Sequence, residues 1–212
     1  MRGGRRTLMA PRRVSWSAVT GSLPTQGDWV TYGGLPWSNG VFEEKNDAPA
    51  LKMELTAAGQ YYRLFLPDSL RSQAAVEIDF TFAGVSSILT LSPLTLWLPG
   101  ETAAVYHGLI NPRTSVALVA NNNGAPISHL LGATQHVRYQ LRLERRAGEA
   151  KSFLNGVEKL THGTLTPNAK RTTQLSNFPM DAPNDCCLLL THPGIGATQT
   201  VWIHGLLWEE LH

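Results

Sequence analysis

The stretch "HVRYQLRLERRAGEAKSFLNGVEKL", residues 136–160, carries the clearest fold signal in the sequence. Between positions 137 and 144 apolar and polar residues alternate, so one side of an extended chain faces a core and the other faces water. Gly148 allows the chain to turn, and residues 151–154 return as a second strand. Asn155-Gly156 then predicts a tight hairpin, because both residues tolerate the positive φ angles of a type I′ turn. The stretch therefore predicts consecutive antiparallel strands.

Short apolar or alternating runs of the same kind fill the chain from Asp28 onward, separated by Gly, Pro and Asn. No amphipathic helix competes with them, and no internal repeat is visible. The composition agrees, since 42% hydrophobic residues can build a core while only 16% are charged, with 19 Gly and 13 Pro for turns. Because no break in composition divides the 212 residues, we expect one all-β antiparallel sandwich over residues 28–212, preceded by an extended arm over residues 1–27.

Two motifs resemble concanavalin A-like (laminin G/pentraxin-type) jelly rolls. The run "FLNGV", residues 153–157, is similar to their penultimate hairpins, where a hydrophobic pair often precedes Asn-Gly-Val. The closing run "TVWIHGLLWEEL", residues 200–211, resembles their last strand. The resemblance covers about residues 28–211 in order of elements. It implies two curved antiparallel sheets, and often glycan binding on the concave side or at loop tips.

The run "AAVEIDFTFAG", residues 74–84, places two carboxylates two residues apart, and paired carboxyl groups are the catalytic equipment of glycoside hydrolases. Laminarinase-like retaining β-glucanases, in the same superfamily, carry a strand that reads Glu-apolar-Asp-apolar-(apolar)-Glu. The resemblance places Glu77 at the nucleophile position, with Asp79 as its helper, and requires an acid/base at position 81 or 82. Those positions hold Thr81 and Phe82. Retaining hydrolysis needs a second carboxyl group about 5–5.5 Å from the first, so we assign no catalytic residue.

Two other interpretations of this run remain. In the simpler one it is a half-buried strand, with apolar residues at 76, 78, 80 and 82 facing the core and the acids facing water. In the other the polar face binds sugar hydroxyls or a cation without cutting. Aromatic rings at exposed positions would add stacking surfaces, although in a sandwich a tryptophan is more often packed under a loop. The candidate glycan-binding residues are Trp37, Glu77, Asp79 and Trp97.

The N-terminal segment is basic, and no acid precedes Asp28 although the formal net charge of the chain is only +2. It lacks the apolar core of a secretory signal, and no run reaches transmembrane length. Arginine forms bidentate bonds to carboxylates and phosphates, so we expect an arm that orders on a partner surface. A floppy tail, or an arm packed on its own domain with Trp16 as anchor, are the alternatives. The partner-binding residues are Arg2, Arg5, Arg6, Arg12 and Arg13.

Metal and cofactor signals are weak. The seven histidines show no ligand spacing, and adjacent Cys186 and Cys187 diverge on a strand, so we expect free thiols and no metal site. We expect no cofactor; the amides of residues 121–123 could bind sugar or Ca²⁺, but a loop is the simpler interpretation. The basic stripe over residues 138–146 lacks interleaved aromatics, so neither sequence-specific nucleic-acid binding nor a membrane role is expected.

Together these features predict a non-enzymatic structural or adhesive sandwich that is a subunit of a larger assembly and contacts glycans. The absence of an export signal and the basic arm favour a bacteriophage virion, in which the chain would be an oligomeric decoration or fibre-type protein made in the bacterial cytoplasm. The alternatives are a glucanase-related hydrolase whose acid comes from elsewhere in the chain, or a free soluble lectin in the cytoplasm. Fold-level analogy carries the functional part of this prediction.

Overall fold

The computed structural model describes residues 10–31, 33–67, 73–84, 94–98, 105–110, 115–120, 127–130, 134–146, 149–162, 186–192 and 198–212. These residues form strands β1 to β14 and three single-turn 3₁₀ helices, with no α-helix among them. The helices are η1 (Ala18–Thr20), η2 (Pro24–Gln26) and η3 (Trp37–Asn39). In the described part of the chain, no helix has the length and apolar character needed to span a membrane.

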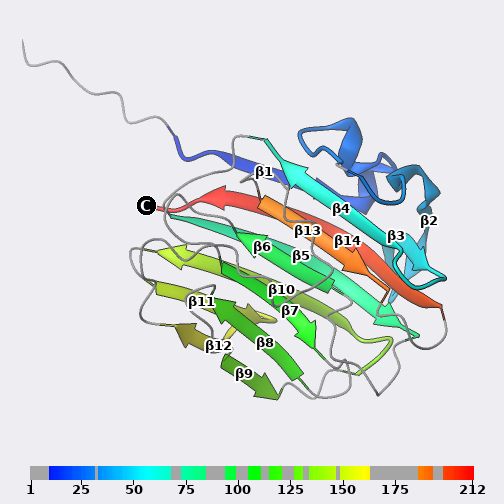
Figure 1. Ribbon diagram of the computed structural model, residues 1–212. Helices are drawn as coiled ribbons and strands as arrows, with labels where there is room; N and C mark the ends of the chain where they lie inside the picture. The colour runs from blue at the N-terminus through cyan, green and yellow to red at the C-terminus, as the bar shows by residue number, and fades with distance from the viewer. Residues whose placement is uncertain are drawn as a thin grey trace, which may run out of the picture.

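The strands make two antiparallel sheets stacked face to face (Figure 1). The eight-stranded sheet has the order β12-β11-β10-β5-β14-β3-β2, and β1 also pairs with β14. Its members are β1 (Arg13–Ser17), β2 (Val41–Lys45), β3 (Ala48–Leu55), β5 (Ala74–Ala83), β10 (Arg138–Arg146), β11 (Glu149–Leu154), β12 (Val157–His162) and β14 (Gln199–Glu210). The six-stranded sheet has the order β4-β13-β6-β7-β8-β9. Its members are β4 (Tyr61–Leu66), β6 (Leu94–Leu98), β7 (Val105–Ile110), β8 (Ser115–Ala120), β9 (Ile127–Leu130) and β13 (Cys186–Thr191).

The predicted antiparallel sandwich is therefore confirmed, and β5 shows why the sequence folds this way. Its alternate residues lie in the core between the sheets, as the period of two requires. Tyr139, Leu141 and Leu143 of β10 reach the same core. The large apolar residues that β5 contributes are Val76, Ile78, Phe80 and Phe82, each exposing 2% or less of its surface.

The stretch that predicted three consecutive strands forms β10, β11 and β12, paired in that order. Asn155 and Gly156 have φ angles of 52° and 76°, which confirms the type I′ turn between the second and third strands. One residue departs from the predicted alternation. Val137 is 41% exposed, because β10 begins only at Arg138 and Val137 still belongs to the preceding turn.

Strand β14 is the longest strand and pairs along its length with β5. Its other edge is shared, since residues 199–203 pair with β3 and residues 205–209 pair with β1. The register on β5 shifts between Ile203 and Gly205, so His204 is the extra residue of a β-bulge. Because β3 is paired with β14 only as far as Leu51, the tip of the β2–β3 hairpin extends beyond the paired part of the sheet.

The predicted arm is shorter than the sequence suggested, because residues 13–17 form β1 on the edge of β14. Val14 is 7% exposed and belongs to the core, where its register partner is Trp208. Trp16 packs against that core, and its Nε1 donates to the carbonyl of Ser22 at 2.7 Å. These two apolar residues lie on one face of β1, and burying them holds the segment on its own sandwich. The alternative with Trp16 as anchor is the correct one for this part of the chain.

Two of the five arginines assigned to a partner surface therefore contact their own domain. Arg12 donates from Nη1 to the carbonyl of Pro67 at 3.1 Å and lies 5.6 Å from the ring centroid of Trp208. The Nε of Arg13 is 3.9 Å from a carboxylate oxygen of Glu209. The remaining three, Arg2, Arg5 and Arg6, lie outside the described residues.

The docking of β1 can be tested with two substitutions on neighbouring residues. Val14→Asp places a charge in the core and should lower the free energy of unfolding by about 3 kcal/mol. Ser15→Asp places the same charge on the exposed side of the strand and should change it by less than about 0.5 kcal/mol. Chemical denaturation of both variants measures the difference. Equal stabilities would show that β1 is not held in the sandwich.

Candidate functional site

The acidic residues of β5 lie on the outer face of the eight-stranded sheet, beside the polar residues of β10. In the antiparallel register Asp79 is opposite Gln140, and Thr81 is opposite Arg138. The side-chain bonds run diagonally, from Arg138 to Asp79 and from Gln140 to Glu77. We call the set Glu77, Asp79, Arg138 and Gln140 the polar floor.

The polar floor consists of two bonded pairs that remain partly in water. The guanidinium of Arg138 donates two hydrogen bonds to the carboxylate of Asp79, from Nε and from Nη2, and the bond from Nε to Oδ1 is 2.8 Å long. This hydrogen bond raises the pKa of Arg138, so the guanidinium keeps its charge. The Nε2 of Gln140 donates to Glu77 at 2.8 Å. The side chains of Arg138 and Asp79 are 41% and 25% exposed, which leaves atoms of both accessible to a ligand.

Arg142 closes one end of the polar floor. It lies 3.6 Å from Glu77, donates to Glu144 at 2.8 Å and also donates to Glu209 on β14. Burial alone would lower the pKa of Arg142, but the hydrogen bonds to Glu209 and Glu144 outweigh it and raise the pKa. Arg142 therefore links β10, β5 and β14 as a fixed cation, and Glu77 carries two partners.

Thr81, at one of the two positions where a retaining glucanase would carry its acid, is buried and bonded to the bulge residue. Its Oγ1 is 3.2 Å from Nε2 of His204, and Nδ1 of His204 is 3.0 Å from the carbonyl oxygen of Pro49. A carbonyl only accepts, so in the neutral imidazole the proton lies on Nδ1, and Nε2 accepts from the threonine hydroxyl. Burial lowers the pKa of His204. Thr81 has no exposed surface, so it offers neither a carboxyl group nor an accessible hydroxyl.

Trp202 lies next to the polar floor on the same face, as the register partner of Thr81 on β14. It forms a small apolar cluster with Ala50 and Ala83, separate from the main core. Its Nε1 donates to Glu43 at 2.6 Å, and the ammonium of Lys45 stands 4.4 Å from its ring centroid. Sequence reasoning missed this residue. The alternation in "TVWIH" was the available signal, because Val201 and Ile203 face the core and Trp202 must face outward.

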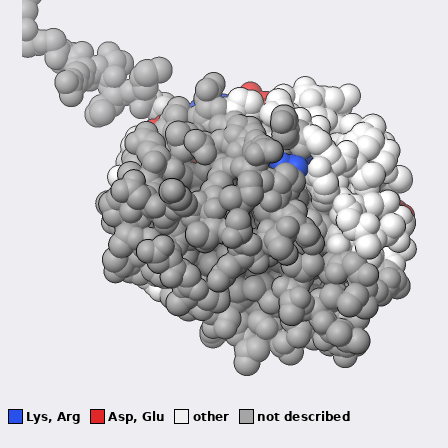
Figure 2. All heavy atoms as spheres, in the orientation of Figure 1, with Lys and Arg blue, Asp and Glu red and all other residues white. Residues whose placement is uncertain are grey.

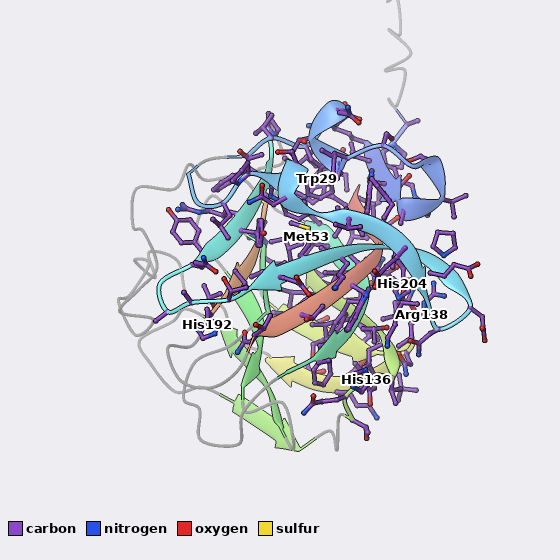
Figure 3. The ribbon with its side chains drawn as sticks, turned by 90° about the vertical axis from the view of Figure 1, so that its right-hand side faces the viewer. Trp29, Met53, His136, Arg138, His192 and His204 are labelled. Carbon is purple, nitrogen blue, oxygen red and sulfur yellow. The ribbon has the colours of Figure 1, made fainter. Side chains whose placement is uncertain are left out.

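The polar floor lies on the eight-stranded sheet, on the outer face of the sandwich. Figure 3 shows His136, Arg138 and His204 on the side of the eight-stranded sheet. Figure 2 has the orientation of Figure 1 and shows the molecule from the side of the six-stranded sheet, so the polar floor on the other sheet is not in view. The asparagines at 121–123 lie outside the described residues. Within the described ranges, no group of three His, Cys, Asp or Glu side chains could hold a metal ion.

Of the predicted glycan-binding residues, Glu77 and Asp79 come together in the polar floor, while Trp37 does not join them. Trp37 is 1% exposed, donates from Nε1 to the carbonyl of Arg63 at 2.9 Å and meets Tyr62 edge-on. The expectation that it is an exposed stacking surface is wrong, because helix η3 lies on the core and buries the indole. Trp97 is the register partner of Cys187 on β13, and its side chain lies outside what the structure describes.

Comparison with known proteins identifies the fold. No family model matches the chain, and no curated protein matches its sequence. Solved structures do match: a transglycosylase, apo Crh5, has a TM-score of 0.60 at 10% identity, over 96% of this chain and 88% of that one. A structure described under endo-acting O-glycanases of human gut microbiota that initiate mucin breakdown has a TM-score of 0.59 at 12% identity, over 94% and 99%. Arcelin-5, a lectin-like defence protein from Phaseolus vulgaris, has a TM-score of 0.55 at 6% identity, over 94% and 99%.

At these identities the likeness shows the fold alone. The chain has a two-sheet β-sandwich fold of the concanavalin A type, as the resemblance predicted, and the structures that share this fold include a lectin-like defence protein and a transglycosylase. Fold does not choose between binding and catalysis, so that choice depends on the residues of the site.

The buried His204 predicts a pH dependence of stability. Its pKa in the folded state is below the ordinary value of 6.5, so the unfolded state takes up a proton more readily. The contribution of His204 to stability is therefore complete above pH 6.5 and is lost as the pH falls from there towards the folded-state pKa. The free-energy difference between the wild type and His204→Gln should shrink between pH 7.5 and pH 5.5, measured by chemical denaturation. A wild-type slope in His204→Gln would contradict the assignment.

Proposed function

We propose that this protein binds carbohydrate on the outer face of the eight-stranded sheet and does not cleave it. The observation that carries the proposal is the polar floor, in which a carboxylate–guanidinium pair and a carboxylate–amide pair lie side by side, partly exposed, next to an indole. The fold of the chain, which lectin-like proteins share, supports the proposal as an analogy.

The chemistry of the polar floor suits sugar hydroxyl groups. Each hydroxyl donates one hydrogen bond and accepts others, so neighbouring hydroxyls are matched by planar groups that offer donors and acceptors together. Asp79 and Glu77 supply acceptors, while Arg138 and Gln140 supply donors. Because these side chains already hold one another, a ligand would not have to order them, and the entropy cost of binding is reduced.

The partners of the two carboxylates support binding over hydrolysis. Glu77 accepts a hydrogen bond from Gln140 and faces Arg142, and Asp79 accepts two hydrogen bonds from Arg138. A retaining mechanism needs one carboxyl group as nucleophile and a second, protonated one beside the leaving oxygen. Thr81, the residue at that place on β5, is buried and hydrogen-bonded to His204. A hydrolase with an acid from another segment is the alternative, and it requires a carboxyl group that none of these contacts supplies.

The role as an assembly subunit, with a bacteriophage virion as the assembly, extends this proposal. Its support is the run of basic residues before Ala10 in the sequence, which includes Arg2, Arg5 and Arg6. A partner rich in carboxylates or phosphates would suit them. Adhesion through a glycan-binding face and attachment through a basic segment are compatible, because the polar floor is built from β5 and β10 and does not include this segment.

Titration calorimetry with laminari- and cello-oligosaccharides tests the binding site. Gln140→Ala should weaken binding by about 2- to 12-fold, as expected for the loss of one hydrogen bond, and Asp79→Asn should weaken it further because Arg138 loses the charge and one of the two acceptor oxygens of its partner. Glu54→Gln removes a carboxylate on β3 that pairs with Lys52 instead, and should leave affinity unchanged. Wild-type affinity in the Asp79→Asn, Gln140→Ala double variant would place the site elsewhere. No binding of any glycan on an array would refute the proposed function.

An assay of reducing ends tests the absence of hydrolysis. After incubation with laminarin, lichenan or agarose, the protein should release no more reducing ends than a heat-denatured blank, because the acid of the catalytic pair is missing. Turnover that disappears in Glu77→Gln would show instead that the chain is a hydrolase with Glu77 in its catalytic pair.

A further inference from the structure

The tip of the β2–β3 hairpin is attached to the turn before β10, although two strands lie between them in the sheet order. Asn46 and Asp47 form the tip, with φ angles of 53° and 57°. The Nδ2 of Asn46 donates to the carbonyl of His136 at 2.9 Å, and Nζ of Lys45 is 3.3 Å from Nδ1 of the same residue. Since β5 and β14 separate β10 from the hairpin, the tip must cross the outer face of these strands beside the polar floor.

Trp202 lies under this crossing. The ring of His136 is 6.3 Å from the ring of Trp202, and Glu43 holds its Nε1. The ammonium of Lys45 stands over the ring, and the indole is only 8% exposed. Its cluster partners are two alanines, which are too small to enclose an indole. The hairpin, and not the main core, therefore accounts for much of the burial of Trp202.

We propose that Lys45 is an internal plug, which occupies the face of Trp202 on which a sugar ring would stack. This inference rests on the proposed function and concerns the regulation of the same site. The face of an indole attracts a cation and also stacks on the apolar face of a sugar ring, but it can hold only one partner. A glycan chain bound along the polar floor reaches the indole when the hairpin tip lifts and Lys45 leaves the ring.

The contacts that hold the tip of the β2–β3 hairpin on the turn before β10 are weak enough to break when the tip lifts. Asn46 and His136 are exposed, and the contacts that Asn46 and Lys45 make with His136 are polar contacts at the surface, which water can replace at little cost. The residues of β2 from 41 to 44 are all exposed, so the apolar surface that lifting the tip uncovers is mainly that of Trp202 and its small cluster. β3 is not paired with β14 beyond Leu51, so residues 48–50 lie outside that ladder and are joined to β14 by the bond from His204 to the carbonyl of Pro49.

A plug and a purely structural strap predict opposite effects of the same substitution. If Lys45 competes with the ligand for the ring, Lys45→Ala exposes Trp202 and strengthens glycan binding. If the lysine only holds the hairpin in a conformation that the ligand needs, its removal weakens binding. Lys52→Ala is the matched control, because Lys52 is the register partner of Trp202 on β3 and pairs with Glu54. It removes the same charge from the same face.

The experiment measures acrylamide quenching of tryptophan fluorescence and the affinity for laminarihexaose in the wild type, Lys45→Ala and Lys52→Ala. Quenching should increase in Lys45→Ala alone, and the increase should vanish when Trp202→Phe is added. The affinity of Lys45→Ala should rise by about 2- to 30-fold, the range expected for losing a competing cation–π contact.

The two measurements separate the inference from the proposed function. Quenching in Lys45→Ala equal to that in Lys52→Ala would overturn the inference, and so would weaker sugar binding by Lys45→Ala than by the wild type. Increased quenching together with no binding of laminarihexaose by any variant would support Lys45 as the cover of Trp202 and count against the proposed function.

Discussion

Strand β5 pairs with β10 on one side and β14 on the other, and its inner face builds the core while its outer face carries the polar residues of the site. The inner face carries four large apolar residues that are almost fully buried, each of which contributes roughly 1.5–3 kcal/mol by burial. The outer face carries Glu77, Asp79 and Thr81. A shift of one residue in register would exchange the two faces, so burial of the inner face also determines where the acids lie. The polar floor exists because the core requires this register.

The bulge at His204 has a second consequence for the same face. It lets the outer edge of β14 pair with β3 over its first half and with β1 over its second half. His204 turns towards Thr81 and the carbonyl of Pro49, which places the end of the β2–β3 hairpin beside β5. The hairpin tip then crosses towards the start of β10 and covers Trp202. One extra residue therefore links the sheet, the polar floor and the cover over the indole.

Most of the fold could be predicted from the sequence, while the site could be predicted only in part. The alternation of apolar and polar residues and the Asn155-Gly156 turn are local signals, so β10, β11 and β12 could be predicted from the sequence. The bonds of the polar floor join residues 59 and 63 positions apart, and nothing local specifies which strand lies beside β5. Trp37 was misplaced because its flanking turn residues predict a loop without saying which side of it is buried. The prediction for the N-terminal segment relied on its arginines and did not use the alternate apolar residues Val14 and Trp16, which bind β1 to the sandwich.

The central claim is that a glycan binds along the polar floor and reaches Trp202. The most direct measurement is a titration of ¹⁵N-labelled protein with laminarihexaose, followed by amide chemical shifts. The account predicts that the largest shifts occur in β5 and β10 at the polar floor, in the indole N–H of Trp202 and at the β2–β3 tip around Asn46. Shifts confined to the six-stranded sheet, with these positions unchanged at saturation, would contradict it.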